Sequence, residues 1–194
     1  MANKTRFFIK FLRSPNTVGS VCPSSNKLCQ AMISGINIDK LDSVVELGAG
    51  TGVITNCIAH STMQSATVIT IELDRHLAED IRREIPEIHV VNDSAVNLKE
   101  ILENHNISSV GAIVSGLPWS IFPEKLQTDI LDAVVENLAP DGFFTTFAYL
   151  QGIYLPAGRR FKRQLKKRFA SVEISPIIWR NFPPAFVYRC SRAR

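Results

Sequence analysis

The stretch "VVELGAGTG", residues 44–52, decides the fold. It joins a β-branched apolar run to a turn with glycine at every second position, and a helical pattern follows from Thr51. Glycines let a backbone turn sharply and pass close to a ligand, and open α/β sheets bind ligands at the carboxyl ends of their strands. The stretch therefore predicts the first strand, the ligand loop and a helix start of an α/β sheet.

Short apolar runs alternate with helical patterns after this loop. The runs are too apolar for a sheet with one wet face, which is typical of a parallel sheet covered on both faces. Two late runs have no helix between them, so they predict an antiparallel hairpin. Strands are predicted at 43–47, 67–72, 89–91, 110–115, 143–150, 171–179 and 185–190, and helices at about 51–60, 74–84, 97–105 and 123–138.

Composition favours one soluble domain. The chain has 194 residues, of which 45% are apolar and 21% charged, enough for one sizeable core. No apolar run could span a bilayer, and the N-terminus lacks the apolar core of a secretory signal, so we expect a cytoplasmic protein. The four cysteines form no C-x-x-C pair and have no histidine at metal-ligand spacing, so we expect reduced thiols and no metal.

Positive charge is concentrated in two segments, 1–13 and 159–168. Together they hold 11 of the 22 basic residues and no acid, so the remaining residues carry 11 bases against 18 acids. Attraction for an anionic partner is therefore expected to be local.

Two acidic residues indicate which ligand the loop binds. Glu72 follows Gly52 by twenty residues, at the end of the second predicted strand, where a carboxylate can accept hydrogen bonds from ribose hydroxyls. Glu46 stands where a pyrophosphate would approach, and its charge suits a cationic or amino-bearing ligand instead. S-adenosylmethionine, which carries a sulfonium and an α-amino group, meets both conditions. A tight turn without a ligand is the alternative for the glycines alone.

From about residue 42 onward the chain resembles the class I S-adenosylmethionine-dependent methyltransferases, through "VVELGAGTG" and "VITIELD". The resemblance implies a Rossmann-like α/β fold with seven strands, mostly parallel with an antiparallel C-terminal hairpin, plus N-terminal helices. We expect a single domain over 1–194, with a helical cap over 1–35 and the core over 42–194.

The resemblance also assigns cofactor contacts. It places Glu46 and the glycine loop around the methionine part, Glu72 on the ribose and Leu73 against the adenine. Asp93 and Ser94 match the position that hydrogen-bonds the adenine amino group, although a turn or helix-cap role is the alternative for Asp93. The loop residues in this set are Gly48, Ala49, Gly50, Thr51 and Gly52.

The stretch "SGLPWSIFP", residues 115–123, follows the fourth predicted strand, where this fold brings the acceptor to the methyl group. It is similar to the N-L-P-Y type motif of ribosomal RNA adenine dimethyltransferases, but Ser115 stands where those enzymes have asparagine. The helical domain that follows the core in those enzymes has no counterpart before Arg194. Nucleic acid is therefore not the expected partner.

A closer resemblance is to the bacterial phospholipid N-methyltransferases. It is carried by "FLRSPNTVGSVCPSS" (11–25), the cofactor loop, "SGLPWSIFP" and "IWRNFPPAFVYR" (178–189), and so spans nearly the whole chain. It implies methylation of the phosphatidylethanolamine head group, and of its mono- and dimethyl forms, toward phosphatidylcholine. In that family the segment with Ser24 and Ser25 borders the cofactor pocket, while a helix cap is the simpler role for Ser24.

The acceptor is expected to be positioned by one loop and by tyrosines. Tyr149, Tyr154 and Tyr188 are candidates for holding the amine or a lipid phosphate. Trp119 could make a cation–π contact with a methylated head group, with an ordinary packed aromatic as the alternative. The loop residues are Ser115, Gly116, Leu117, Pro118 and Trp119.

Two segments favour a peripheral position at the inner membrane surface. Residues 4–13, "KTRFFIKFLR", form a predicted amphipathic helix that suits an anionic bilayer, with a cover for the cofactor pocket as the alternative. In 159–169 an apolar stripe runs among seven cations, and packing on the sheet is the better explanation of that stripe. Because RNA would attract the same cations, an RNA adenine methyltransferase, a small-molecule or protein methyltransferase and a binding protein all remain alternatives.

Overall fold

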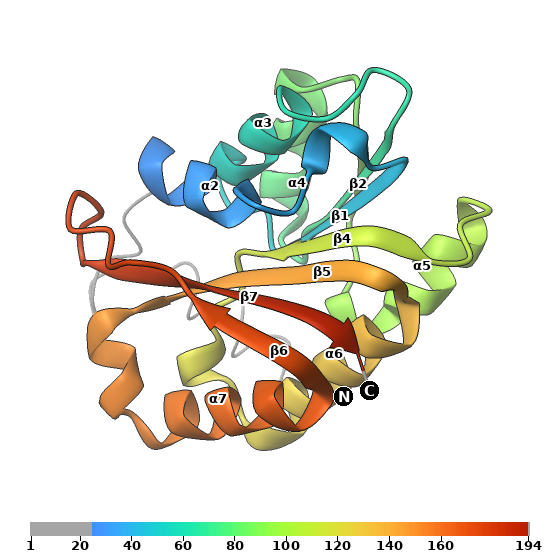
Figure 1. The fold of residues 1–194 in the computed structure, drawn as a ribbon. Helices are drawn as coiled ribbons and strands as arrows, with labels where there is room; N and C mark the ends of the chain where they lie inside the picture. Colours follow the sequence, from blue (N-terminus) through green and yellow to red (C-terminus); the bar gives the residue numbers. More distant parts are fainter. Residues whose placement is uncertain (1–24, 194) are drawn as a thin grey trace.

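A computed structural model describes residues 25–193, and within them seven strands form one sheet (Figure 1). The strand order is β3-β2-β1-β4-β5-β7-β6. Pairing is parallel from β3 to β5, and β7 is antiparallel to both of its neighbours. The strands are β1 (Ser43–Leu47), β2 (Thr67–Ile71), β3 (His89–Val91), β4 (Val110–Ser115), β5 (Leu138–Tyr149), β6 (Phe169–Ile174) and β7 (Ala185–Ala193).

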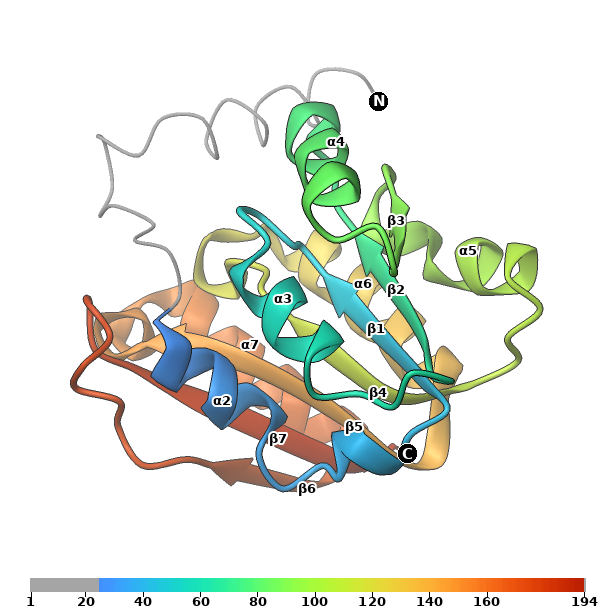
Figure 2. The same ribbon diagram turned by 90° about the horizontal axis from the view of Figure 1, so that it is seen from above.

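Helices cover both faces of the sheet. Figures 1 and 2 show α2, α3 and α4 on one face and α5, α6 and α7 on the other, so each face buries its own apolar core. This two-sided cover explains why strand residues such as Val44 and Val45 are both fully buried. The helices are α2 (Asn26–Ile33), α3 (Val53–Ala59), α4 (Arg75–Glu84), α5 (Leu98–Asn104), α6 (Glu124–Asn137) and α7 (Pro156–Arg168), with short 3₁₀ turns η1 (Ile38–Lys40), η2 (Ala95–Asn97), η3 (Trp119–Ile121) and η4 (Leu150–Tyr154).

Local chemistry explains where several helices begin. The Ser25 hydroxyl accepts a hydrogen bond from the Leu28 N–H at the start of α2, and the Asp74 carboxylate accepts one from the His76 N–H at the start of α4. Each side chain satisfies a donor that the helix itself leaves free. Pro156 opens α7 at a position where a missing N–H is harmless.

One row of paired residues marks the carboxyl edge of the sheet. Ile71 pairs with Leu47, and Leu47 pairs with Ser115. The row continues outward from Ser115 through Thr146, Tyr188 and Ile174. The loops beyond this row therefore lie at one end of the molecule, where open α/β sheets bind ligands.

The predicted fold is confirmed, including the antiparallel hairpin. One boundary prediction was wrong: β6 ends at Ile174 rather than at residue 179. Pro176 cannot donate to a strand partner, and beyond it only an isolated bridge joins Ile178 to Ala185. Residues 175–184 consequently form a loop between β6 and β7. The helix predicted over residues 4–13 lies outside the described residues.

Candidate functional site

The glycine loop after β1 is shaped by left-handed backbone conformations. Gly48, Gly50 and Gly52 have φ values of 77°, 57° and 78°, which side chains with a Cβ rarely adopt. The Gly48 N–H donates to the Ile71 carbonyl at 2.8 Å, so the loop starts in register with β2. A Cβ built on Gly50 would have no atom within 4 Å. Gly50 therefore presents bare backbone to open space.

Glu46 lies completely buried beneath this loop. Its Oε2 accepts hydrogen bonds from the Thr55 hydroxyl at 2.6 Å and the Thr70 hydroxyl at 3.0 Å. Burial raises the pKa of Glu46 to about 7, although the two hydroxyl bonds act in the opposite direction. Its Oε1 is buried without a partner among the described residues. An unpaired buried carboxylate oxygen fits a ligand that brings a positive charge or an N–H donor, as S-adenosylmethionine does.

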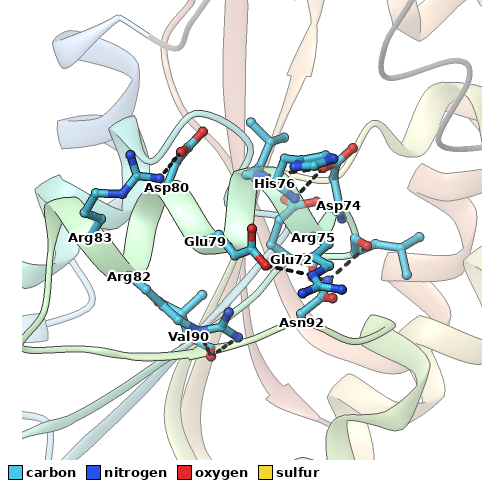
Figure 3. Close-up of polar contacts among 12 residues, drawn as sticks. Glu72, Asp74, Arg75, His76, Glu79, Asp80, Arg82, Arg83, Val90 and Asn92 are labelled. Carbon is cyan, nitrogen blue, oxygen red and sulfur yellow. Dashed lines mark hydrogen bonds and ion pairs between the residues drawn. The ribbon is translucent and has the colours of Figure 1, made fainter.

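Glu72 is held by backbone donors at the end of β2. Its Oε2 accepts from the Gly50 N–H at 2.8 Å and its Oε1 accepts from the Asp74 N–H at 2.9 Å. Asn92 lies beside it in Figure 3 and donates to the Glu72 and Leu73 carbonyls. Burial raises the pKa of Glu72. Because each carboxylate oxygen has two lone pairs, each retains the capacity to accept a ribose hydroxyl.

The remaining predicted cofactor contacts, after β3, have local partners. The Asp93 carboxylate accepts from the Ser94 N–H at 2.6 Å and from the Asn97 side-chain amide at 2.9 Å. The Ser94 hydroxyl accepts a long bond from the Val96 N–H at the start of η2. Asp93 thus has the turn role that was the alternative, and its contact with adenine stays a prediction.

The loop after β4 interlocks with the glycine loop. A Cβ on Gly116 would lie 2.5 Å from the Gly48 carbonyl oxygen, and one on Gly48 would lie 2.6 Å from Leu117 Cδ2. The Gly116 N–H also donates to the Leu47 carbonyl at 2.9 Å. The two loops approach so closely that glycine is needed on both sides. Cofactor loop and predicted acceptor loop are therefore adjacent.

Trp119 differs from the cation–π prediction. Its side chain is only 2% exposed, and its ring stacks on Phe161 with centroids 4.5 Å apart and planes 16° apart. Its indole N–H lies within hydrogen-bonding distance of the Ser115 hydroxyl, at 3.1 Å, and of the Thr146 hydroxyl, at 3.0 Å. The ring packs between the sheet and α7, so it offers no face to a head group. The packed-aromatic alternative agrees with this position.

The structure does not bring the three candidate tyrosines together. Tyr149 is half-buried and packs with Phe147 in the core under α2. Tyr188 is 3% exposed in the opposite core, where burial raises its pKa to about 12. Tyr154 is 71% exposed in η4. Of the three, Tyr154 has the most accessible ring.

Sequence reasoning missed one buried residue at this end of the molecule. Asn181 is 2% exposed, and its Oδ1 accepts a hydrogen bond from the Ser25 N–H at 3.0 Å. Ser25 therefore starts α2 beside the β6–β7 loop, while Ser24 lies outside the described residues. The two partners are 156 positions apart, and the adjacent Phe-Pro-Pro turn was the only local signal.

The basic segment 159–168 is part of α7, and its apolar stripe faces the sheet. Phe161, Leu165 and Phe169 are at most 2% exposed. Arg168 pairs with Asp132 on α6 at 2.6 Å. The stripe is therefore a packing face, as expected.

A cavity of about 580 Å³ lies behind the glycine loop, between α2, α3 and the end of α4. Thr51 and Gly52 are the predicted site residues that line it, together with Asn56, Cys57 and His60. The cavity does not include Glu46, Glu72 or the acceptor loop, so we locate the site at the carboxyl edge instead. Within residues 25–193, no cluster of histidine, cysteine or acidic side chains could hold a metal ion.

Comparisons with known proteins agree with this geometry. The sequence model of the protein-L-isoaspartate(D-aspartate) O-methyltransferase family matches residues 7–101. The ornithine lipid N-methyltransferase of Singulisphaera acidiphila is 33% identical over 187 residues, covering 95% of this chain and 93% of that protein. The ribosomal RNA small subunit methyltransferase A of Ureaplasma urealyticum is 28% identical over 120 residues, covering 58% of this chain and 41% of that protein.

Among solved structures, the O-methyltransferase from Bacillus cereus in complex with SAH superimposes with a TM-score of 0.68 at 12% identity, over 96% of this chain and 90% of that one. At this identity the likeness supports the fold alone. The family follows instead from the long match to the Singulisphaera protein. The chain belongs to the class I S-adenosylmethionine-dependent methyltransferases, and S-adenosylmethionine is its cofactor.

Proposed function

We propose that this enzyme methylates the amine of a membrane lipid head group, with phosphatidylethanolamine and its mono- and dimethyl forms as acceptors. The observation that carries the proposal is the similarity to a lipid N-methyltransferase along nearly the whole chain. The name of that relative also makes an ornithine lipid a second candidate acceptor. Both acceptors present a primary amine on a lipid, so the shared chemistry is N-methylation of an aminolipid.

The acceptor loop supports a small amine rather than a nucleobase. Residues 115–119 contain two polar side-chain groups, the Ser115 hydroxyl and the Trp119 indole N–H, and both are used inside the core. Reading a base edge requires side-chain donors and acceptors that are free to face the base. The loop instead confines the acceptor by shape, through Gly116, Leu117 and Pro118.

The cofactor end of the site follows from the two buried acids. S-adenosylmethionine, when bound, supplies an electrophilic methyl group. In our proposal Glu46 meets the positive charge of its methionine part, Glu72 accepts the ribose hydroxyls, and Leu73 packs on the adenine. Ala49 and Thr51 contribute loop backbone, and Asp93 and Ser94 border the adenine. What the protein contributes to the reaction is mainly the alignment of amine and methyl group, with water kept away.

The proposal also includes a position at the inner surface of a membrane and a single domain over 1–194. Of the helices within residues 25–193, none has the length and apolarity to cross a bilayer. The basic aromatic segment 4–13 lies outside the described residues and is proposed to contact anionic lipid. Tyr149, Tyr154 and Ser25 are proposed to border the acceptor and cofactor.

The test is methyl transfer from labelled S-adenosylmethionine by the full-length protein. Vesicles containing phosphatidylethanolamine, vesicles containing ornithine lipid, ribosomal RNA and free ethanolamine are offered separately. We expect label in lipid and none in RNA, and the ratio between the lipids identifies the acceptor. A Glu72→Ala variant is the control for cofactor-dependent labelling. Label in RNA or free ethanolamine but never in lipid would contradict the proposal.

A further inference from the structure

Large apolar side chains are exposed mainly at one end of the molecule. Among the described residues, the large hydrophobic side chains that are most exposed include Phe182 at 82%, Tyr154 at 71% and Trp179 at 68%. Met63 is exposed at 38% in the turn that precedes β2, at the opposite edge of the sheet. The other six share two segments at the carboxyl edge: Tyr154, Leu155, Ile174, Ile177, Trp179 and Phe182.

These two segments lie next to each other and next to the acceptor loop. Ile174 is level with Ser115 in the row of paired residues, so the β6–β7 loop projects beyond the same edge. The Leu150 N–H donates to the Pro184 carbonyl at 2.8 Å, which joins η4 to that loop. Figure 1 shows η4, the start of α7 and the β6–β7 loop at one end of the sheet.

A buried asparagine holds the β6–β7 loop so that its neighbours face outward. Asn181 is 2% exposed and donates from its side-chain amide to the Pro183 carbonyl at 2.8 Å, besides accepting from the Ser25 N–H. Arg180 and Phe182, on either side of it, are exposed. The aromatic display is therefore a held conformation of the loop.

The charge around these apolar side chains is positive. Arg159 is exposed, and its guanidinium donates to the Tyr154 carbonyl at 2.9 Å. Arg180 forms no ion pair with any described residue. Between residues 150 and 184 the sequence has one acid, Glu173, which already pairs with Arg189 at 3.3 Å. Aromatic rings bordered by unneutralised cations match the boundary between acyl chains and anionic head groups.

We propose that Tyr154–Leu155 and Ile174–Phe182 form a docking surface that seats the acceptor end of the enzyme on an anionic bilayer. An exposed apolar patch of this kind marks an interaction site, and the adjacent cations select an anionic lipid surface as the occupant. The docking surface rests on the proposed function and deepens it, because it turns the methyl-transfer site toward the layer that holds the acceptor. It is distinct from segment 4–13 and from the buried face of α7.

Tryptophan fluorescence tests the contact directly in the unmodified full-length protein. The chain has two tryptophans, of which Trp119 is 2% and Trp179 is 68% exposed. Vesicles of phosphatidylethanolamine and phosphatidylglycerol should shift the emission to shorter wavelength, and lipids brominated on their acyl chains should quench it. A Trp179→Phe variant, which retains Trp119, should lose both responses. Binding to these vesicles without any change in Trp179 emission would overturn the proposal.

Vesicle sedimentation then measures what the surface contributes. Trp179→Ala with Phe182→Ala should weaken binding by about tenfold or more, and Arg180→Ala should weaken it severalfold in a salt-dependent way. Met63→Ala and Lys40→Ala are the matched controls, since both remove exposed side chains at the opposite edge. Unchanged vesicle binding in the aromatic variant would overturn the proposal.

Two further readouts separate this proposal from its alternatives. On a short-chain aminolipid kept below its micelle concentration, the aromatic variant should retain wild-type turnover, because no bilayer is involved. Equal loss on monomeric and vesicular lipid would place these residues in the acceptor pocket and overturn the docking role. Vesicle binding that depends on Trp179 without methylation of any lipid would leave the docking surface standing while the proposed function failed. A concentration-dependent dimer abolished by the same variant would assign the patch to a second copy of the chain.

Discussion

The carboxyl edge of the sheet has two halves with different chemistry. The cofactor half consists of the loops after β1, β2 and β3, and it is built from glycine backbone and buried carboxylates that pair with N–H and hydroxyl groups. The acceptor half consists of the loops after β4, β5 and β6, and six large apolar side chains are exposed along it. One half is shaped for a charged small molecule, whereas the other presents a surface.

This contrast explains how one domain can join a water-soluble donor to a lipid. Polar groups that are already satisfied inside the cofactor half bind a ligand with little rearrangement. Exposed rings cost solvation in water and regain it against an apolar partner. The two halves meet where Gly48 faces Gly116, so substitutions there and on either side test how separate they are.

The largest effect is expected at that junction. In Gly116→Ala the new Cβ would lie 2.5 Å from the Gly48 carbonyl oxygen, and overpacking should lower the free energy of unfolding by about 3 kcal/mol and abolish cofactor binding. Gly152→Ala is the matched control, since its Cβ would make an ordinary contact at 3.5 Å with Ser120. Denaturant unfolding with and without S-adenosylmethionine measures both quantities. Wild-type stability in Gly116→Ala would show that the halves are not interlocked.

The next largest effect concerns Glu46 and pH. Burial raises its pKa from 4.5 to about 7, so the folded protein retains a proton that the unfolded chain releases. The free energy of unfolding should therefore fall as the pH rises from about 4.5 through 7, by an amount on the order of 3 kcal/mol. Glu46→Gln should remove this part of the pH dependence. Parallel pH profiles for the two proteins, from urea unfolding, would contradict the shifted pKa.

A smaller effect distinguishes the two tryptophans. Trp119→Phe removes the N–H that faces the Ser115 and Thr146 hydroxyls, which should lower the free energy of unfolding by about 1 to 2 kcal/mol. Trp179→Phe should leave stability unchanged because that ring is 68% exposed. Thermal unfolding measures both. Equal stability of the two variants would mean that Trp119 is not held as described.

The smallest effect on stability is expected for Gly50→Ala. Its φ of 57° disfavours a Cβ, yet the space in front of it is open, so the cost should be about 1 kcal/mol. Cofactor affinity should nevertheless fall strongly, because the methyl group would occupy the space in front of the loop. Gly35→Ala has a similar φ of 74° but lies against Arg189, and it should change stability without changing cofactor affinity. Titration calorimetry with S-adenosylmethionine separates the two, and undiminished affinity in Gly50→Ala would move the cofactor elsewhere.

The elements set by local pattern could be predicted from the sequence. Strand periodicity, the glycine loop and the helix stop at Pro140 depend on neighbours in the chain, so the cofactor half was predicted residue by residue. The position of Trp119 depends on α7, which packs across the sheet from a distant segment. The bond from Ser25 to Asn181 likewise has no local pattern. The acceptor half was less predictable because its environment is made by long-range packing.

The place of β7 in the sheet has a consequence for synthesis. Although β7 follows β6 in the chain, it lies between β5 and β6 and pairs with both. Until residues 185–193 have been made, β6 has no partner strand and the β6–β7 loop has only one fixed end. The cofactor half can assemble on the ribosome earlier, whereas the lipid-facing end forms only when this late strand is inserted. Translation order thereby delays the exposure of a sticky aromatic surface until the rest of the enzyme is folded.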